Sequence, residues 1–239
     1  VRLVHAATGI QCDVSIGNEA ALHKTALLNV YSKSEPLFRE LCLLVKHWAR
    51  KRKLNSPRDN TLSSYTWTLL VIHFLQRRQP ALLPMIDTPT LQAANLKKFE
   101  QKKKTAVGGT VNRPTSAAKL LYEFFSFFAE LDPATYGTIS IRVGQLVMHP
   151  GQRLMCARML ASPGMLSVED PVCPEEDLGR VLKPRTQELI LRELRRAHQL
   201  LSWYPSERAM EADKAWERLR MGLWTRMQMW SGGCGFFVP

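Results

Sequence analysis

Two basic side chains, a pair of hydroxyls and a tyrosine lie close together in the first third of the chain. Lys46 and Arg50 are four residues apart, so a helix carries both cations on one face. Ser63 and Ser64 precede an almost wholly apolar run, where a hydroxyl caps a helix and free backbone N–H groups bind anions. Tyr65 offers a ring on which a nucleobase stacks. This combination predicts a nucleoside triphosphate site without a glycine-rich phosphate loop.

A carboxylate near the start of the chain is a further candidate. Residues 10–16 alternate, with Ile10, Cys12, Val14 and Ile16 on one face of a predicted strand. Asp13 therefore lies on the other, polar face. Spacing alone favours an ordinary exposed strand carboxylate at this position.

Hydrophobic periodicity predicts the elements that position these residues. The predicted helices cover residues 19–32, a stretch beginning at Ser34, and residues 62–76, 116–131, 177–202 and 206–230. The predicted strands cover residues 1–16, 138–147 and 166–171. The first helix is expected to bury Leu22, Leu27, Leu28 and Tyr31. The second is expected to bury Leu37, Leu41, Leu44, Val45 and Trp48, which leaves both cations off its buried face.

Two segments have an unusual composition. Residues 92–119 contain the basic run Leu96–Lys104 and read as an insertion or linker, which contacts RNA phosphates or is simply a solvated loop. Helix 116–131 has one aromatic face, which is more typical of a protein core than of a nucleic-acid platform. Its members are Tyr122, Phe124, Phe125, Phe127 and Phe128.

The composition limits the class of protein. The 239 residues are 45% hydrophobic, enough for a core, and carry a formal net charge of +12 with a pI near 9.8. Such an excess favours an anionic partner, above all nucleic acid, with a membrane surface as the competing reading. The longest apolar run, Thr68–Leu75, is too short to cross a membrane. Five cysteines without a C-x-x-C pair indicate a reducing compartment and argue against a Cys/His metal site.

Several short motifs follow one another in a characteristic order. They are Cys12–Ser15, Asn18 with Ala21–Thr25, Val45–Arg50, Thr61–Tyr65, and Val168–Pro171 followed by Asp177–Arg180. This order resembles the RNA terminal uridylyltransferases and noncanonical poly(A) polymerases of the DNA polymerase beta-like nucleotidyltransferase superfamily. The resemblance covers roughly residues 5–200.

The resemblance implies roles for individual residues. Asp13 corresponds to the third carboxylate of the catalytic metal site. Asn18, Lys24 and Thr25 stand where the family contacts ribose and base. Lys46 and Arg50 stand where two cations bind triphosphate, and Ser64 and Tyr65 where a serine holds phosphate and a tyrosine stacks on the base. Asp170 and Glu176 stand in the late motif that recognises the base.

The sequence departs from the family pattern in several places. The family's glycine-serine motif and its Asp-x-Asp pair lie upstream of the strand that carries Asp13, so we expect this chain to lack them. Lys24 replaces a usual asparagine and has donors but no acceptor. Cys173 replaces a glutamate that uridylyltransferases often have, and Glu176 replaces a histidine found in some members. These changes leave the choice between uridine and adenosine open.

The resemblance implies an α+β fold, in which the end of a palm sheet precedes a mostly helical, poly(A)-polymerase-like central domain. Residues 1–17 are assigned to the palm and residues 18–205 to the central domain with its insertion 92–119. Residues 206–239 are expected to form a C-terminal amphipathic helix and tail.

The expected activity of the intact protein is template-independent addition of uridines from UTP to RNA 3′ ends, with Mg²⁺ or Mn²⁺ and release of pyrophosphate. Residues 1–239 alone, with one of the three metal carboxylates, are expected to be inert. Addition of adenosine from ATP and an inactive RNA-binding or assembly scaffold are the alternatives. The expected partners are an RNA 3′ end, a nucleoside triphosphate and protein partners on the C-terminal helix, without a membrane. The expected location is the mitochondrial matrix or the cytoplasm.

Overall fold

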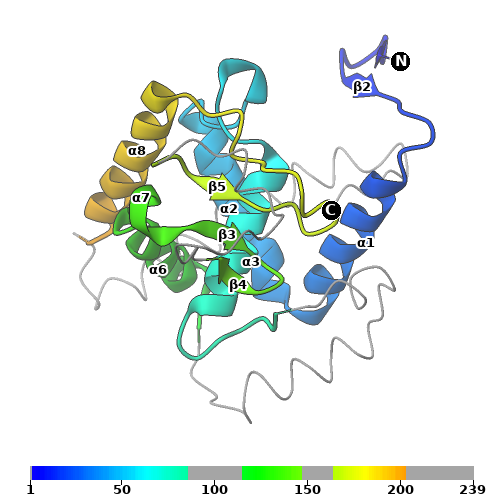
Figure 1. Cartoon of the computed structure of the whole chain (residues 1–239). Helices are drawn as coiled ribbons and strands as arrows, with labels where there is room; N and C mark the ends of the chain where they lie inside the picture. The colour runs from blue at the N-terminus through cyan, green and yellow to red at the C-terminus, as the bar shows by residue number, and fades with distance from the viewer. Residues whose placement is uncertain (1, 86–114, 147–163, 203–239) are drawn as a thin grey trace.

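The computed structural model describes residues 2–85, 115–146 and 164–202, and these form a mixed, mostly helical fold (Figure 1). The helices are α1 (Glu19–Ser34), α2 (Pro36–Lys51), α3 (Ser64–Arg77), α6 (Ala117–Ala129), the short α7 (Pro133–Tyr136) and α8 (Pro184–Ser202), with a 3₁₀ turn at Pro57–Asp59. The strands are β1 (Arg2–Val4), β2 (Gln11–Asp13), β3 (Thr138–Ser140), β4 (Gly144–Leu146) and β5 (Ser167–Val168). The expected α+β class is confirmed.

Helix α3 lies at the centre of this fold. Its N-cap is Ser63, whose Oγ accepts the backbone N–H of Thr66 at 3.0 Å. Every residue from Thr66 to Gln76 is buried, as expected for a helix that is apolar on all sides. Helix α2 packs along it, and α6, β3 and β4 contact it as well. The central helix predicted from the apolar run is therefore confirmed, with its start placed at Ser64.

The aromatic side chains of α6 belong to the core, as predicted. Phe124, Phe125 and Phe128 are buried, and the Phe125 ring lies 4.8 Å from that of Trp48 on α2. Helix α8 covers the other side of α6. This packing ties the C-terminal part of the described chain to the helices that carry the candidate site.

A small sheet with the strand order β4-β3-β5 lies against α3 (Figure 1). β3 pairs with β4 antiparallel and with β5 parallel, placing Ile139 opposite Val168. The sequence predicted one strand over 138–147, but the chain turns after Ser140. The Ser140 hydroxyl accepts the backbone N–H groups of Arg142 and Val143 and so stabilises this turn.

Helix α1 differs from the prediction in its buried face. Leu27 and Tyr31 are buried, but Leu22 is 71% exposed. The buried residues lie in the second half of α1, which adjoins α2, so the stripe does not continue to the first turns. Ahead of α1, β1 and β2 pair as a hairpin at the edge of the structure (Figure 1).

Two further predictions need correction. Helix α8 begins at Pro184 rather than at residue 177, because proline disfavours helical geometry in the residue before it and is well placed in a first turn. On α2, Leu37, Leu44 and Trp48 are only half-buried, and Phe38, Cys42 and Ala49 complete the buried face.

Some predictions lie outside the described residues: the basic run within 92–119 and the helix and tail at 206–239. Among the residues that the structure describes, no helix combines the length and apolarity needed to cross a bilayer.

Candidate functional site

Side chains from three separate elements meet beside the start of α3. The Lys24 ammonium of α1 lies 2.5 Å from Oδ2 of Asp170, which follows β5. The Tyr65 hydroxyl of α3 donates to Oδ1 of the same carboxylate at 3.4 Å. Lys24 Nζ also lies over the Tyr65 ring, 5.4 Å from its centroid, within the range of a cation–π contact. These three residues, predicted from separate motifs, therefore form one cluster.

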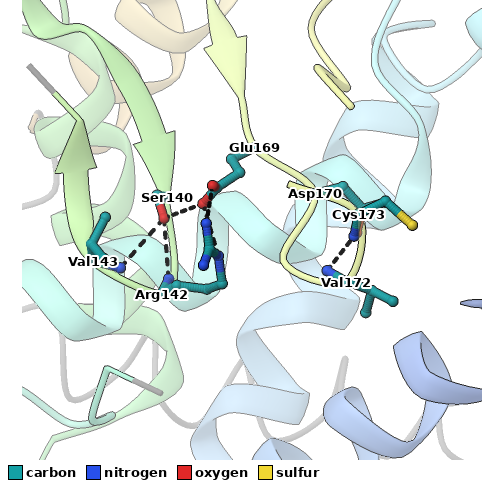
Figure 2. Close-up of polar contacts among 7 residues, drawn as sticks. All are labelled: Ser140, Arg142, Val143, Glu169, Asp170, Val172 and Cys173. Atoms are coloured by element: carbon teal, nitrogen blue, oxygen red, sulfur yellow. Dashed lines mark hydrogen bonds and ion pairs between the residues drawn. The ribbon is translucent and has the colours of Figure 1, made fainter. Parts of the chain in front are cut away.

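Asp170 is fully buried and is held by its own loop (Figure 2). Its Oδ1 accepts the backbone N–H groups of Val172 at 3.0 Å and of Cys173 at 3.4 Å. Its backbone N–H donates to the carbonyl of Glu176 at 3.1 Å, which closes the loop. Oδ1 is thus fully used by the protein, whereas Oδ2 faces Lys24.

The environment of Tyr65 keeps its phenol protonated. Burial raises the pKa of Tyr65 well above its usual range, and the Asp170 carboxylate raises the pKa further. The hydroxyl is therefore a donor toward Asp170 throughout the neutral range. Tyr65 as a whole residue is only half-buried, so part of it is open to solvent.

Sequence reasoning missed an ionic network next to Asp170. Glu169 is buried and pairs with the Arg142 guanidinium and with the Ser140 hydroxyl (Figure 2). Ser140 is the last residue of β3, and Arg142 lies in the β3–β4 turn. The network therefore ties that turn to the segment that carries Asp170. No local signal in the sequence pairs residue 140 with residue 169.

At the start of α3, the two serines have different environments. Ser63 is the N-cap, and its hydroxyl also bonds to Thr66 at 2.8 Å. Ser64 is exposed, and its hydroxyl exchanges hydrogen bonds with the Asn55 amide, the shorter at 2.8 Å. Ser64 is therefore accessible beside backbone N–H groups of the first turn, which have no helical partner.

Lys46 and Arg50 extend from α2 off its buried face, as predicted. Lys46 is half-buried and Arg50 is exposed. Neither cation forms an ion pair with another residue of the described ranges. Two cations without a carboxylate partner, on a helix that packs against α3, are suited to bind an anion.

Asn18 and Thr25 use polar atoms within α1. The Asn18 side chain accepts the backbone N–H of Ala21 at 3.1 Å and caps the helix. Thr25 Oγ1 donates to the carbonyl of Ala21 at 2.8 Å. The Asn18 side-chain carbonyl is therefore engaged in capping.

The loop after Asp170 contains two of the residues at which the sequence departs from the family pattern. Cys173 and Glu176 are both half-buried, and Glu176 donates its backbone N–H to the Cys173 carbonyl at 2.8 Å. Burial raises the pKa of the Cys173 thiol, and the nearby Asp170 charge adds to this effect. The thiol is therefore a neutral group next to the cluster.

Asp13 lies at the end of β2, opposite Arg2 in the hairpin register. Two Mg²⁺ or Mn²⁺ ions need several oxygen ligands, and one aspartate provides too few. Across the described parts of the chain, no cluster of three or more His, Cys, Asp or Glu residues has a metal-binding arrangement. These residues by themselves do not fit a two-metal centre.

Comparison with curated proteins identifies relatives with one kind of activity. Terminal uridylyltransferase cid1 of Schizosaccharomyces pombe is 34% identical over 124 residues, which cover 50% of this chain and 30% of that protein. Poly(A) RNA polymerase cid13 of the same yeast is 28% identical over 202 residues, covering 81% of this chain and 34% of that protein. The human mitochondrial poly(A) RNA polymerase is 38% identical over 89 residues, which cover 37% of this chain and 15% of that protein. No protein-family model matches the sequence.

Solved structures of enzymes of the same kind have a similar fold. The Cid1 poly(U) polymerase with Mg 3′-dATP bound superposes with a TM-score of 0.66 at 26% identity, covering 86% of this chain and 64% of that one. A cytoplasmic RNA terminal U-transferase superposes with a TM-score of 0.67 at 24% identity, covering 86% and 65%, and supports the fold alone.

The fold and the relatives are those of nucleotidyltransferases. Within that class, the chain is similar to the terminal uridylyltransferases and the poly(A) RNA polymerases. The matched region spans only about a third of the length of the curated yeast relatives, at 30% and 34%.

Proposed function

We propose that this protein adds nucleotides without a template to RNA 3′ ends, taking uridines from UTP and releasing pyrophosphate. The observation that carries this proposal is the convergence of Lys24, Tyr65 and Asp170 beside the start of α3. The relatives named for terminal uridylyl transfer and for poly(A) synthesis support the same chemistry.

The proposed roles rest on the family resemblance, and the contacts around Tyr65 and Asp170 support the part at the base. The base stacks on the Tyr65 ring, which is worth about 1–3 kcal/mol and tolerates any base. Asp170 reads a base edge, with Glu176 and Cys173 in the same loop. Asn18 and Thr25 lie at the ribose side. Lys46, Arg50 and Ser64 bind the triphosphate, whose charge shifts toward the leaving pyrophosphate as the RNA 3′-hydroxyl attacks in line.

The proposed metal is Mg²⁺ or Mn²⁺, with Asp13 as one ligand. A bound ion of this kind activates the attacking hydroxyl and stabilises the leaving group. Asp13 requires further carboxylates as co-ligands, and this requirement motivates the scaffold hypothesis together with Lys24 and the +12 charge. In the scaffold alternative, the fold binds RNA through its +12 charge and catalyses nothing.

A second candidate substrate is ATP. Poly(A) RNA polymerases are among the relatives, and the loop that follows Asp170 carries Cys173 and Glu176 where uridylyltransferases have other residues. Both substrates use the same cluster, so the distinction lies in the base edge that Asp170 meets.

The experiment is an extension assay. The intact protein receives a labelled RNA, Mg²⁺ and each ribonucleoside triphosphate in a separate reaction, with Asp13→Ala as control. Uridine addition that the Asp13→Ala variant lacks supports the proposal, and adenosine addition instead selects the alternative substrate. RNA binding without addition of any nucleotide would refute the enzyme and leave the scaffold.

The remaining assignments are part of the same proposal. Residues 1–17 are the end of a palm domain, residues 18–205 a central nucleotide-binding domain, and residues 206–239 a C-terminal helix and tail. The comparisons give no support for protein partners on that helix. The matrix of mitochondria is one proposed location, since mitochondrial enzymes are among the relatives, and the cytoplasm is the other. Imaging of a tagged protein distinguishes them.

A further inference from the structure

The Lys24 ammonium contacts the two groups of the proposed site that would bind a base, the Asp170 carboxylate and the Tyr65 ring. It pairs with Asp170 through Oδ2, and it lies over the ring of Tyr65. Lys24 itself is 24% exposed, whereas the Asp170 side chain is fully buried. The lysine thus stands between the carboxylate and solvent.

The hydrogen bonds of Asp170 leave one oxygen for this contact. Oδ1 accepts from the Tyr65 hydroxyl and from the backbone N–H groups of Val172 and Cys173. Oδ2 accepts no hydrogen bond from the described residues and has only the Lys24 ion pair. A buried carboxylate that loses its only compensating charge is strongly disfavoured. A ligand that displaces Lys24 from Oδ2 must therefore donate a hydrogen bond to that oxygen.

Lys24 and a base would also compete for the face of the Tyr65 ring. A base on Tyr65 would use the ring face over which the ammonium lies. A cation over an aromatic ring is itself a favourable contact. The base and the lysine therefore compete for Tyr65 as well as for Asp170.

We propose that Lys24 acts as an internal competitor: a nucleotide binds by displacing its ammonium from Asp170 and Tyr65. This inference rests on the proposed function, because it needs a base stacked on Tyr65. The exchange admits only a base that gives an N–H to Asp170 Oδ2. Uracil does so through N3–H, and adenine through its amino group.

If Lys24 contacted the nucleotide instead of competing with it, its removal would change the affinity in the opposite direction. If Lys24 stayed in place and donated directly to the base or to phosphate, its removal would weaken nucleotide binding. If Lys24 is a competitor, its removal strengthens binding, because no ion pair has to be broken. The sign of the change separates the two.

The test is calorimetry on the full chain with UTP and N3-methyl-UTP. We expect Lys24→Met to bind UTP roughly tenfold or more tightly than the unsubstituted chain, a change of about 1.4 kcal/mol per factor of ten. Lys33→Met removes an exposed lysine from the last turn of the same helix and leaves the affinity unchanged. Weaker binding of UTP to Lys24→Met would overturn the proposal.

A second variant keeps the proposal testable if Lys24→Met does not fold. Asp170→Asn removes the charge that holds the lysine and supplies an amide in place of the carboxylate. The unsubstituted chain should bind N3-methyl-UTP at least about tenfold more weakly than UTP, and Asp170→Asn should lose most of this discrimination. Equal binding of the two nucleotides to the unsubstituted chain would refute the exchange. Absence of UTP binding to every variant would instead refute the nucleotide site itself.

Discussion

Glu169 and Asp170 are adjacent in the chain, yet separate sets of partners hold their two buried carboxylates (Figure 2). Glu169 pairs with Arg142 on the β3–β4 turn, and Asp170 pairs with Lys24 on α1. The Glu169 backbone N–H also donates to the Ile139 carbonyl at 2.9 Å. Because neighbouring side chains of an extended segment point to opposite sides, anchoring Glu169 to the small sheet also fixes the direction of Asp170.

The first prediction concerns the stability of this anchor. Arg142→Met leaves the buried Glu169 carboxylate without its cation, so we expect a loss of about 3–5 kcal/mol in the free energy of unfolding. Replacing both members with methionine should cost much less, because the uncompensated charge is gone. Urea unfolding measures both changes.

A surface pair provides the control for this measurement. Lys119 lies 4.0 Å from Glu123 on α6, and the lysine is half exposed. Lys119→Met should change stability by less than about 1 kcal/mol. Equal losses for Lys119→Met and Arg142→Met would contradict the anchoring role.

The second prediction concerns stacking on Tyr65. Tyr65→Ala should weaken the binding of all four nucleoside triphosphates by a similar amount, about 1–3 kcal/mol, because stacking does not distinguish bases. Tyr65→Phe keeps the ring and should retain most of the affinity. Tyr122→Ala, on the exposed side of α6, is the matched control. Calorimetry with each nucleotide gives the result, and a shift in base preference in Tyr65→Ala would show that the ring does more than stack.

The third prediction distinguishes residues that bind the triphosphate from residues that bind the base. Lys46→Met and Arg50→Met should each lower the affinity for UTP by about 1.5–3 kcal/mol, the range for hydrogen bonds to charged groups. Neither change should affect the affinity for uridine, which has no phosphate. Lys51→Met, one residue beyond Arg50 and exposed, is the control. A loss of uridine binding in Lys46→Met would place that lysine at the base instead.

Local sequence patterns were sufficient for the helices that carry the site. The serines before an apolar run correctly placed the start of α3, because capping is a property of adjacent residues. The spacing of Lys46 and Arg50 correctly placed them off the buried face, since helical geometry fixes which side chains share a side. The aromatic face of α6 was correctly assigned to the core.

Contacts between distant segments were not predictable in this way. The Glu169–Arg142 pair joins residues from different elements, and neither residue has a neighbour that reveals the other. The exposure of Leu22 depends on how far α2 extends alongside α1, which periodicity does not encode. The Lys24–Asp170 pair is likewise a contact between distant segments. The motifs pointed to both residues, but only the fold shows that they meet.

The fourth prediction concerns RNA and the basic run Lys97–Lys104. Its five lysines are Lys97, Lys98, Lys102, Lys103 and Lys104. Replacing them with glutamine should lower the affinity for single-stranded RNA, and each lost phosphate contact should reduce the slope of log affinity against log salt by about 0.7. Fluorescence anisotropy over a salt series measures the slope. An unchanged slope would mean that the run is a solvated loop.

The fifth prediction uses the buried histidine of α3. His73 Nε2 lies 2.7 Å from the Tyr136 hydroxyl, and burial lowers the pKa of His73 to about 4. In the unfolded chain its pKa is about 6.5, so the unfolded state takes up a proton first as the pH falls. The His73 contribution is fully present above pH about 6.5 and is lost progressively down to about 4, up to roughly 3 kcal/mol. His73→Gln should flatten this part of the curve of unfolding free energy against pH. His47→Gln, at an exposed position, is the control, and an equally steep curve for His73→Gln would assign the pH dependence to other groups.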